Sequence, residues 1–120
     1  MTDITMGVNE SKFADIIWTN EPLSSSELAR KSEEVLGWKK STSFTVLKRL
    51  CEKGIFKSEG GVVTSVISKE DFYAIQSEQF VEDTFEGSLP SFFAAFTKRK
   101  SLSPEDINEL KEMLAKYEGN

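Results

Sequence analysis

The sequence predicts a mostly α-helical fold with one small β-hairpin, and three observations lead to this prediction. Apolar residues recur at helical spacing along most of the 120 residues. Two short β-branched stretches flank a pair of glycines near the middle of the chain. Helix start and stop signals divide the rest into short segments. We expect the segments up to the end of the hairpin to form one domain, 1–67, and the later helices a second, 68–120.

The first two helices are predicted from their apolar spacing and their end signals. Residues 9–20 carry apolar side chains at helical intervals, and Asn9 is the expected N-cap. Residues 25–36 follow Ser24, which opens a Ser-x-x-Glu capping box. Gly37 stands where a left-handed residue commonly ends a helix. These signals predict two helices joined by a short turn.

A third helix is predicted over residues 41–53, with Gly54 at its end. Four apolar positions share one face at 3.6 residues per turn and are expected to face the core: Phe44, Leu47, Leu50 and Cys51. The opposite face then carries hydroxyls and cations: Ser41, Thr42, Thr45, Lys48 and Arg49. Small hydroxyl side chains let a helix approach base edges, and Lys and Arg reach phosphates, so this face suits DNA. An ordinary solvated helix face explains the same residues equally well.

The hairpin follows directly, with strands expected at 55–58 and 62–67 around Gly60 and Gly61. Two helices joined by a tight turn and followed by a hairpin are typical of a winged helix-turn-helix domain. In that arrangement the second helix of the pair enters the major groove of DNA.

The second domain is predicted as three helices over residues 68–85, 89–100 and 103–117, with Ser68 and Pro104 as start signals. Six of the nine phenylalanines lie in this domain, more than three short helices can cover by themselves. We therefore expect a partner chain to cover them. The expected dimerisation residues are Phe80, Phe85, Phe92, Phe93, Phe96, Leu110 and Leu114.

The charge is unevenly distributed, although the formal net charge is −5. Residues 36–58 hold six Lys or Arg and one Asp or Glu, whereas residues 59–120 hold six and twelve. Positive charge is therefore concentrated around the third predicted helix, as expected for a phosphate-binding surface. The candidate DNA-binding residues are Lys39, Lys40, Ser41, Thr42, Thr45, Lys48, Arg49 and Lys53.

Several other classes of function are disfavoured. The chain has one cysteine, Cys51, and no histidine, so we expect no disulfide, no metal site and no cofactor. Cys51 is either an inert core residue, which we favour, or a redox sensor beside the DNA-binding face. The sequence lacks a histidine, a phosphate-binding glycine loop and a glycine-framed serine nucleophile. These absences disfavour an enzyme. The polar start Met1-Thr2-Asp3 and the absence of a long apolar run predict no membrane partner and a cytoplasmic location.

Two other features have alternative interpretations. Trp38, just before the third helix, either packs in the corner between helices, which we favour, or stacks on a sugar. The run Lys98-Arg99-Lys100 either complements a helix C-terminus, which we favour, or contacts DNA.

The chain resembles the penicillinase-repressor family, BlaI/MecI/CopY, over nearly its whole length. The resemblance to the family's recognition helix covers Trp38 to Gly54. Other matching segments are Ile16-Ile17-Trp18, Pro22-Leu23-Ser24, Glu27-Leu28, Phe85 to Leu89 and Leu102 to Lys111. The resemblance implies a cytoplasmic bacterial homodimer that represses transcription at a palindromic double-stranded DNA operator. It also implies an N-terminal winged helix and a C-terminal helical dimerisation domain.

The sequence departs from the family pattern in three places. The wing, Glu59-Gly60-Gly61, lacks the family's arginine and aromatics, so we expect it to grip phosphate weakly. Ala95-Phe96 stands where penicillin-responsive members have a cleaved Asn-Phe bond, and the C-terminus lacks the paired cysteines of copper-responsive members. Neither inducing signal is expected here. The acidic net charge and the glycine-rich wing also allow a winged-helix module that binds an unknown protein partner and not DNA.

Overall fold

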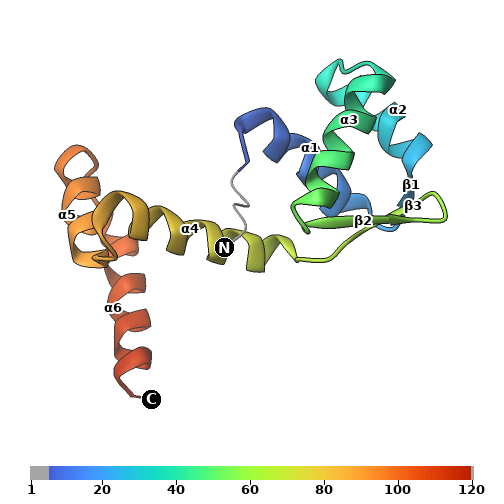
Figure 1. Ribbon diagram of the computed structural model, residues 1–120. Helices are drawn as coiled ribbons and strands as arrows, with labels where there is room; N and C mark the ends of the chain where they lie inside the picture. Colours follow the sequence, from blue (N-terminus) through green and yellow to red (C-terminus); the bar gives the residue numbers. More distant parts are fainter. Residues whose placement is uncertain (1–5, 120) are drawn as a thin grey trace. The chain divides into compact units, whose positions relative to one another are not determined.

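The computed structural model describes residues 6–119. Its helices are α1 (Val8–Asn20), α2 (Ser25–Leu36), α3 (Lys40–Glu52), α4 (Lys69–Phe85), α5 (Leu89–Arg99) and α6 (Pro104–Glu118). Its strands are β1 (Leu23–Ser24), β2 (Phe56–Glu59) and β3 (Val62–Ser65). The mostly helical class with a small hairpin is confirmed (Figure 1). The prediction from the polar start Met1-Thr2-Asp3 concerns residues outside the described range.

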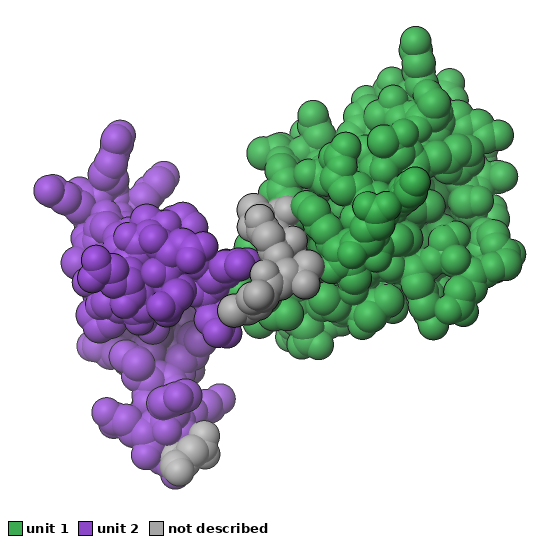
Figure 2. Space-filling view, in the orientation of Figure 1, with its two compact units in different colours: residues 1–77 green, residues 78–120 purple. Residues whose placement is uncertain are grey.

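The chain forms two compact units, 1–77 and 78–120 (Figure 2). This division falls ten residues beyond the domain boundary expected from the sequence at 67 and 68. The physical reason is Phe72 in α4, which is fully buried with the core of the first unit. Its ring lies 5.5 Å from that of Trp18, measured between centroids. The first turns of α4 therefore belong to the winged-helix unit.

The core of the first unit is formed by α1, α2, α3, the sheet and the start of α4. Figure 1 shows α1 to α3 grouped on one side of the strands. The largest fully buried apolar side chains of this core are Phe13, Phe56, Phe72, Ile17, Leu28, Leu50, Ile55 and Val63. Trp38 stacks on Phe13 at a centroid distance of 5.2 Å and packs against the core. The packing interpretation of Trp38 is thus confirmed.

The sheet has three antiparallel strands in the order β1-β3-β2. The sequence predicted the β2–β3 hairpin, whose turn residues Gly60 and Gly61 have φ values of 58° and 77°. Glycine adopts such positive φ values without steric cost. The sequence did not predict β1, because a strand of two residues, Leu23–Ser24, is too short to show alternation. β1 joins the segment before α2 to the inner edge of the wing.

The helix ends agree with the sequence in most places. Ser24 Oγ accepts a hydrogen bond from Glu27 N at 3.1 Å, and Gly37 ends α2 with a φ of 69°. Asn9 was predicted wrongly as the N-cap of the first helix. Gly7 holds that position, and its amide donates to Glu10 Oε1 at 3.4 Å. The Glu10 side chain therefore accepts from the amide of the N-cap residue, whereas an Asn9 N-cap would have accepted from an amide in the first turn of the helix.

Two side-chain contacts attach the end of the wing to α1. The Glu21 carboxylate accepts hydrogen bonds from Ser65 N at 2.8 Å and from Ser65 Oγ at 2.9 Å. Trp18 Nε1 donates to the carbonyl oxygen of Ile67 at 3.0 Å. These bonds connect residues more than forty positions apart in the chain. They fix the hairpin on the helical part of the unit.

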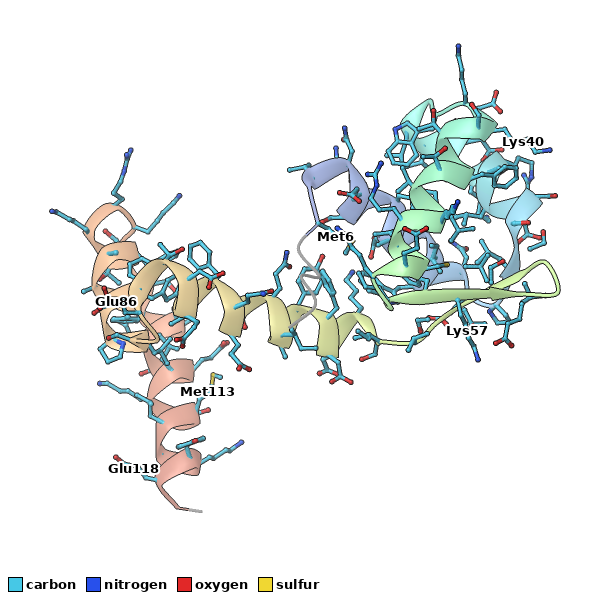
Figure 3. The ribbon with its side chains drawn as sticks, viewed as in Figure 1. Met6, Lys40, Lys57, Glu86, Met113 and Glu118 are labelled. Atoms are coloured by element: carbon cyan, nitrogen blue, oxygen red, sulfur yellow. The ribbon has the colours of Figure 1, made fainter. Side chains whose placement is uncertain are left out.

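The second unit is built from the end of α4, α5 and α6. Ser88 and Ser103 cap α5 and α6 by accepting hydrogen bonds from Ser91 N and Asp106 N. Among the residues that the structure describes in this unit, none is classed as buried. Met113 on α6, labelled in Figure 3, is one of its exposed apolar side chains. The apolar side chains of this unit are therefore more exposed to solvent than those that form the core of the first unit.

Candidate nucleic-acid interface

Helix α3 is anchored by one face and exposed on the other. The buried residues of the helix are Ser43, Val46, Leu47 and Leu50. The sequence prediction that Phe44 faces the core is wrong, because its side chain is 37% exposed. The ammonium nitrogen of Lys40 lies 5.6 Å from the centre of the Phe44 ring. The buried face is therefore rotated toward Ser43 and Val46, and Cys51 is only half-buried at its margin.

The outer face of α3 has the composition expected from the sequence. Six of the predicted DNA-binding residues on this helix are exposed: Lys40 at its first position, and Ser41, Thr42, Thr45, Lys48 and Arg49 along its outer side. Four of them, together with Val46, line a shallow hollow: Ser41, Thr42, Thr45 and Arg49. The structure thus places these hydroxyls and the guanidinium side by side on one accessible surface. We call Ser41, Thr42, Thr45, Lys48 and Arg49 the outer face.

Thr45 shows how the hydroxyls of this face are satisfied before any ligand binds. Its Oγ1 donates to the carbonyl oxygen of Ser41 at 2.9 Å, one turn earlier in the helix. The donor is therefore used internally, while the exposed side chain can still offer a methyl group and acceptor lone pairs. A thymine methyl and a base amino group are partners of that chemistry.

The start of α3 is electropositive and has no side-chain cap. Its N-cap residue is Lys39, whose side chain forms no capping hydrogen bond, and its first turn contains no acidic residue. Unpaired backbone amides and the helix dipole favour an anion at such an end. Lys39 and Lys40 are exposed beside it. Lys40 is labelled in Figure 3 at this end of the helix. The arrangement can hold a phosphate group.

The remaining cations differ in how they are engaged. Lys53, at the other end of α3, is partly exposed. Arg49 Nη1 donates to Glu10 Oε2 at 3.4 Å, a contact that joins α3 to the first turn of α1. Sequence analysis singled out Arg49 but missed Glu10. A carboxylate 39 residues away in the chain gives no local signal of such a pairing.

The wing is short, and its cation is paired. β2 and β3 have four residues each and are joined through Gly60-Gly61. Lys57 on β2, labelled in Figure 3, lies 3.9 Å from a carboxylate oxygen of Glu59. This pairing reduces the net positive charge that the wing presents. Weak phosphate binding by the wing stays a prediction.

The predicted dimerisation residues gather in the second unit. The rings of Phe80, Phe85 and Phe92 lie 5.6 to 6.1 Å apart between centroids, and Phe92 is 6.1 Å from Phe96. Phe80 and Phe96 remain about half exposed. Phe93 and Leu114 are also exposed, and Leu110, Phe85 and Phe92 are intermediate. The cluster therefore presents a large apolar surface.

Comparison with known proteins places these features in a family. The sequence profile of the penicillinase repressor family matches residues 6–116. The chain belongs to the penicillinase repressor family. It is 29% identical over 112 residues to the penicillinase repressor of Bacillus licheniformis, covering 90% of this chain and 88% of that protein. It is 25% identical over 111 residues to the methicillin resistance regulatory protein MecI of Staphylococcus aureus, covering 89% and 90%.

A solved structure supports the winged-helix assignment of this repressor-family chain. The chain is similar to the solution structure of the DNA-binding domain of the repressor BlaI, with a TM-score of 0.51 and 26% identity. The match covers 59% of this chain and 93% of that domain. The winged helix-turn-helix class predicted from the sequence is confirmed. The recognised relatives are named as repressors or regulatory proteins, not as enzymes.

Three further observations concern metal ligands, the cysteine and membrane-spanning helices. Within residues 6–119, no group of three or more His, Cys, Asp or Glu side chains is placed to hold a metal ion. Burial raises the pKa of the Cys51 thiol, and the nearby charge of Glu52 adds to this effect. A raised pKa keeps the thiol protonated and unreactive. No helix in the described range combines the length and apolarity that a membrane crossing requires.

Proposed function

We propose that this chain is a transcriptional repressor that binds a double-stranded DNA operator in the bacterial cytoplasm. The observation that carries the proposal is the outer face of α3, where hydroxyls and cations lie exposed together while the opposite face is buried. In a winged helix-turn-helix domain the second helix of the pair enters the major groove. Family membership and likeness to a DNA-binding domain support this reading.

In this proposal the α3 side chains divide into two roles. Thr42, Thr45 and Arg49 approach base edges, where arginine can form two hydrogen bonds with guanine. Lys39, Lys40, Lys48 and Lys53 neutralise phosphates, which supplies affinity but no sequence information. The concentration of positive charge in residues 36–58 supports this division, although the whole chain is acidic.

We further propose that the repressor is a homodimer that binds a palindromic operator. The half-exposed phenylalanine cluster of the second unit would be covered by the same surface of a second copy. Two winged-helix units would then read two half-sites related by twofold symmetry. A dimer also raises affinity, because binding of the first half-site makes binding of the second intramolecular.

The test is binding to duplex DNA taken from upstream of the protein's own gene, with a scrambled duplex as control. Fluorescence anisotropy at several salt concentrations should show a specific complex that weakens steeply with salt, by a log–log slope of about −0.9 per neutralised phosphate. Thr42→Ala and Arg49→Ala should weaken this complex and leave the dimer intact. Lys111→Ala, which removes a cation from α6, is the charge-matched control for Arg49→Ala.

The dimer has its own test in sedimentation velocity. Phe96→Asp should shift the protein toward monomer and weaken operator binding, because the two half-sites are no longer bound as one unit. Val35→Asp places the same charge on an exposed α2 position, 66% accessible, and should leave the dimer unchanged. A wild-type protein that sediments as a monomer would contradict the proposal.

One alternative function is favoured by two observations. The net charge is −5, and the wing cation Lys57 is paired with Glu59. A winged-helix module that binds a protein partner would share these features. Equal binding of both duplexes, or no binding at low salt, would support this alternative and reject the repressor.

A further inference from the structure

The most informative contact on the DNA-facing side of the first unit joins Arg49 to Glu10. The distance between Arg49 Nη1 and Glu10 Oε2 is 3.4 Å, and the other carboxylate oxygen, Oε1, accepts from Gly7 N at 3.4 Å. Both oxygens of Glu10 are therefore engaged, one by the start of α1 and one by α3. The Glu10 side chain is 20% exposed, whereas that of Arg49 is 51% exposed. Glu10 is the better fixed partner of the pair.

This arrangement leaves most of the guanidinium available. Arginine has five N–H donors in a planar fork, and the carboxylate contact uses one nitrogen at one end. The other donors can address a base or a phosphate. The contact also restricts the rotamers of a long side chain before DNA arrives, so less conformational freedom is lost on binding.

Two of the lysines near the outer face lack such a contact among the described residues. In the part of the chain that the structure describes, Lys39 and Lys48 have no carboxylate within salt-bridge distance. Flexible, unpaired lysines suit phosphates, whose positions are the same for every sequence. A guanidinium fixed against a carboxylate suits a target with a defined geometry, such as the N7 and O6 acceptors of guanine.

The negative charge of Glu10 has a second consequence. A carboxylate next to the DNA-facing arginine repels nearby phosphates, which lowers affinity for every duplex. It also competes with phosphates for the guanidinium. Both effects weaken non-specific binding, which comes almost entirely from phosphate contacts. When Arg49 forms its hydrogen bonds with the matching base, these bonds restore the affinity that Glu10 removes. This compensation occurs only on the operator sequence.

We propose that Glu10 is a positioning residue that holds Arg49 for base recognition and lowers the affinity of the protein for non-operator DNA. This inference rests on the proposed function, since it assigns a role within DNA binding. It makes the first turn of α1, outside the helix-turn-helix pair, a determinant of sequence specificity.

The test compares wild-type protein with Glu10→Gln, both as full-length chains. Two duplexes are used: one selected from a random pool by the wild-type protein, and a scrambled version of it. The glutamine keeps an oxygen that can accept from Gly7 N but removes the charge. The variant should bind the scrambled duplex about three-fold more tightly, the size of effect expected when one exposed charge interaction is removed. The ratio of the two affinities should fall at least about five-fold as base discrimination is lost.

Two further variants separate positioning from simple charge or helix stability. Glu27→Gln removes the same charge from the first turn of α2, where no cation is paired with Glu27 among the described residues. It should leave the affinity ratio unchanged. In an Arg49→Ala background, Glu10→Gln should not alter the ratio, because Glu10 acts through the arginine. Thermal melting of each variant checks that the unit is folded.

The outcomes separate this inference from the function on which it rests. A random pool from which the wild-type protein enriches no sequence overturns both. If the wild-type protein has a preferred sequence and Glu10→Gln leaves the affinity ratio unchanged, only the role of Glu10 is overturned. The same holds if Glu10→Gln lowers the ratio equally with and without Arg49, since the effect would then come from the cap of α1.

Discussion

Phe72→Ala is the substitution that best tests how the two units of this repressor-family protein are divided. Phe72 lies in the first turn of α4 and is fully buried, with its ring 5.5 Å from Trp18 and 5.5 Å from Tyr73. Burial of a phenylalanine side chain contributes about 3 kcal/mol, and its removal leaves a cavity. Trp18, at the edge of this cavity, is half-buried and can partly relax into it. We therefore expect the free energy of unfolding to fall by about 3 kcal/mol, near the lower end of the usual range.

A loss of this size is easily measured, because domains of this size are stable by only about 5–15 kcal/mol. Urea unfolding followed by tryptophan fluorescence reports on the first unit, which contains both tryptophans. The melting temperature should fall by roughly 12–25 °C. Ile75→Ala, three residues later and 40% exposed, is the matched control and should cost less than about 1 kcal/mol. If Phe72→Ala also costs less than about 1 kcal/mol, the start of α4 is not part of the winged-helix core, and the boundary belongs near residue 68.

Three further predictions concern local contacts. Glu21→Ala leaves Ser65 N without its acceptor and should destabilise the protein by about 1–3 kcal/mol in urea unfolding; no change would mean that the wing is held without this bond. Cys51 should react with a thiol reagent more slowly in the folded protein than in urea at pH 8, because burial raises its pKa; equal rates would refute the protected thiol. The hydrogen bond to Asp15 raises the pKa of Lys69, so its stabilising effect is complete below pH 10.5 and is lost as pH rises through the higher folded value. Asp15→Asn should therefore lower stability equally at pH 6 and pH 9; a difference that grows between these two pH values would contradict the assignment.

Helix α3 shows how much of a helix local sequence pattern predicts and which feature it leaves open. Its existence and its hydroxyl-rich outer face were predictable from spacing and from the concentrated positive charge. Its exact rotation was not. The sets Phe44, Leu47, Leu50, Cys51 and Ser43, Val46, Leu47, Leu50 share two members, and their centres differ by about 60° around the helix axis. The sequence favours the first set because all four of its members are apolar, whereas the structure buries the second set, which includes Ser43.

The order of the helices and the hairpin could be predicted from the sequence, because these elements depend on local signals. Serine caps, the positive φ of Gly37 and the Gly60-Gly61 turn act within a few residues. The sequence also predicted the family and the outer-face residues. The tertiary structure alone decided which side of α3 is buried, the addition of β1 to the sheet, and the inclusion of Phe72 in the first core. It alone paired Glu10 with Arg49. Each of these features depends on contacts between residues far apart in the chain, and no local pattern records which distant surface a side chain will meet.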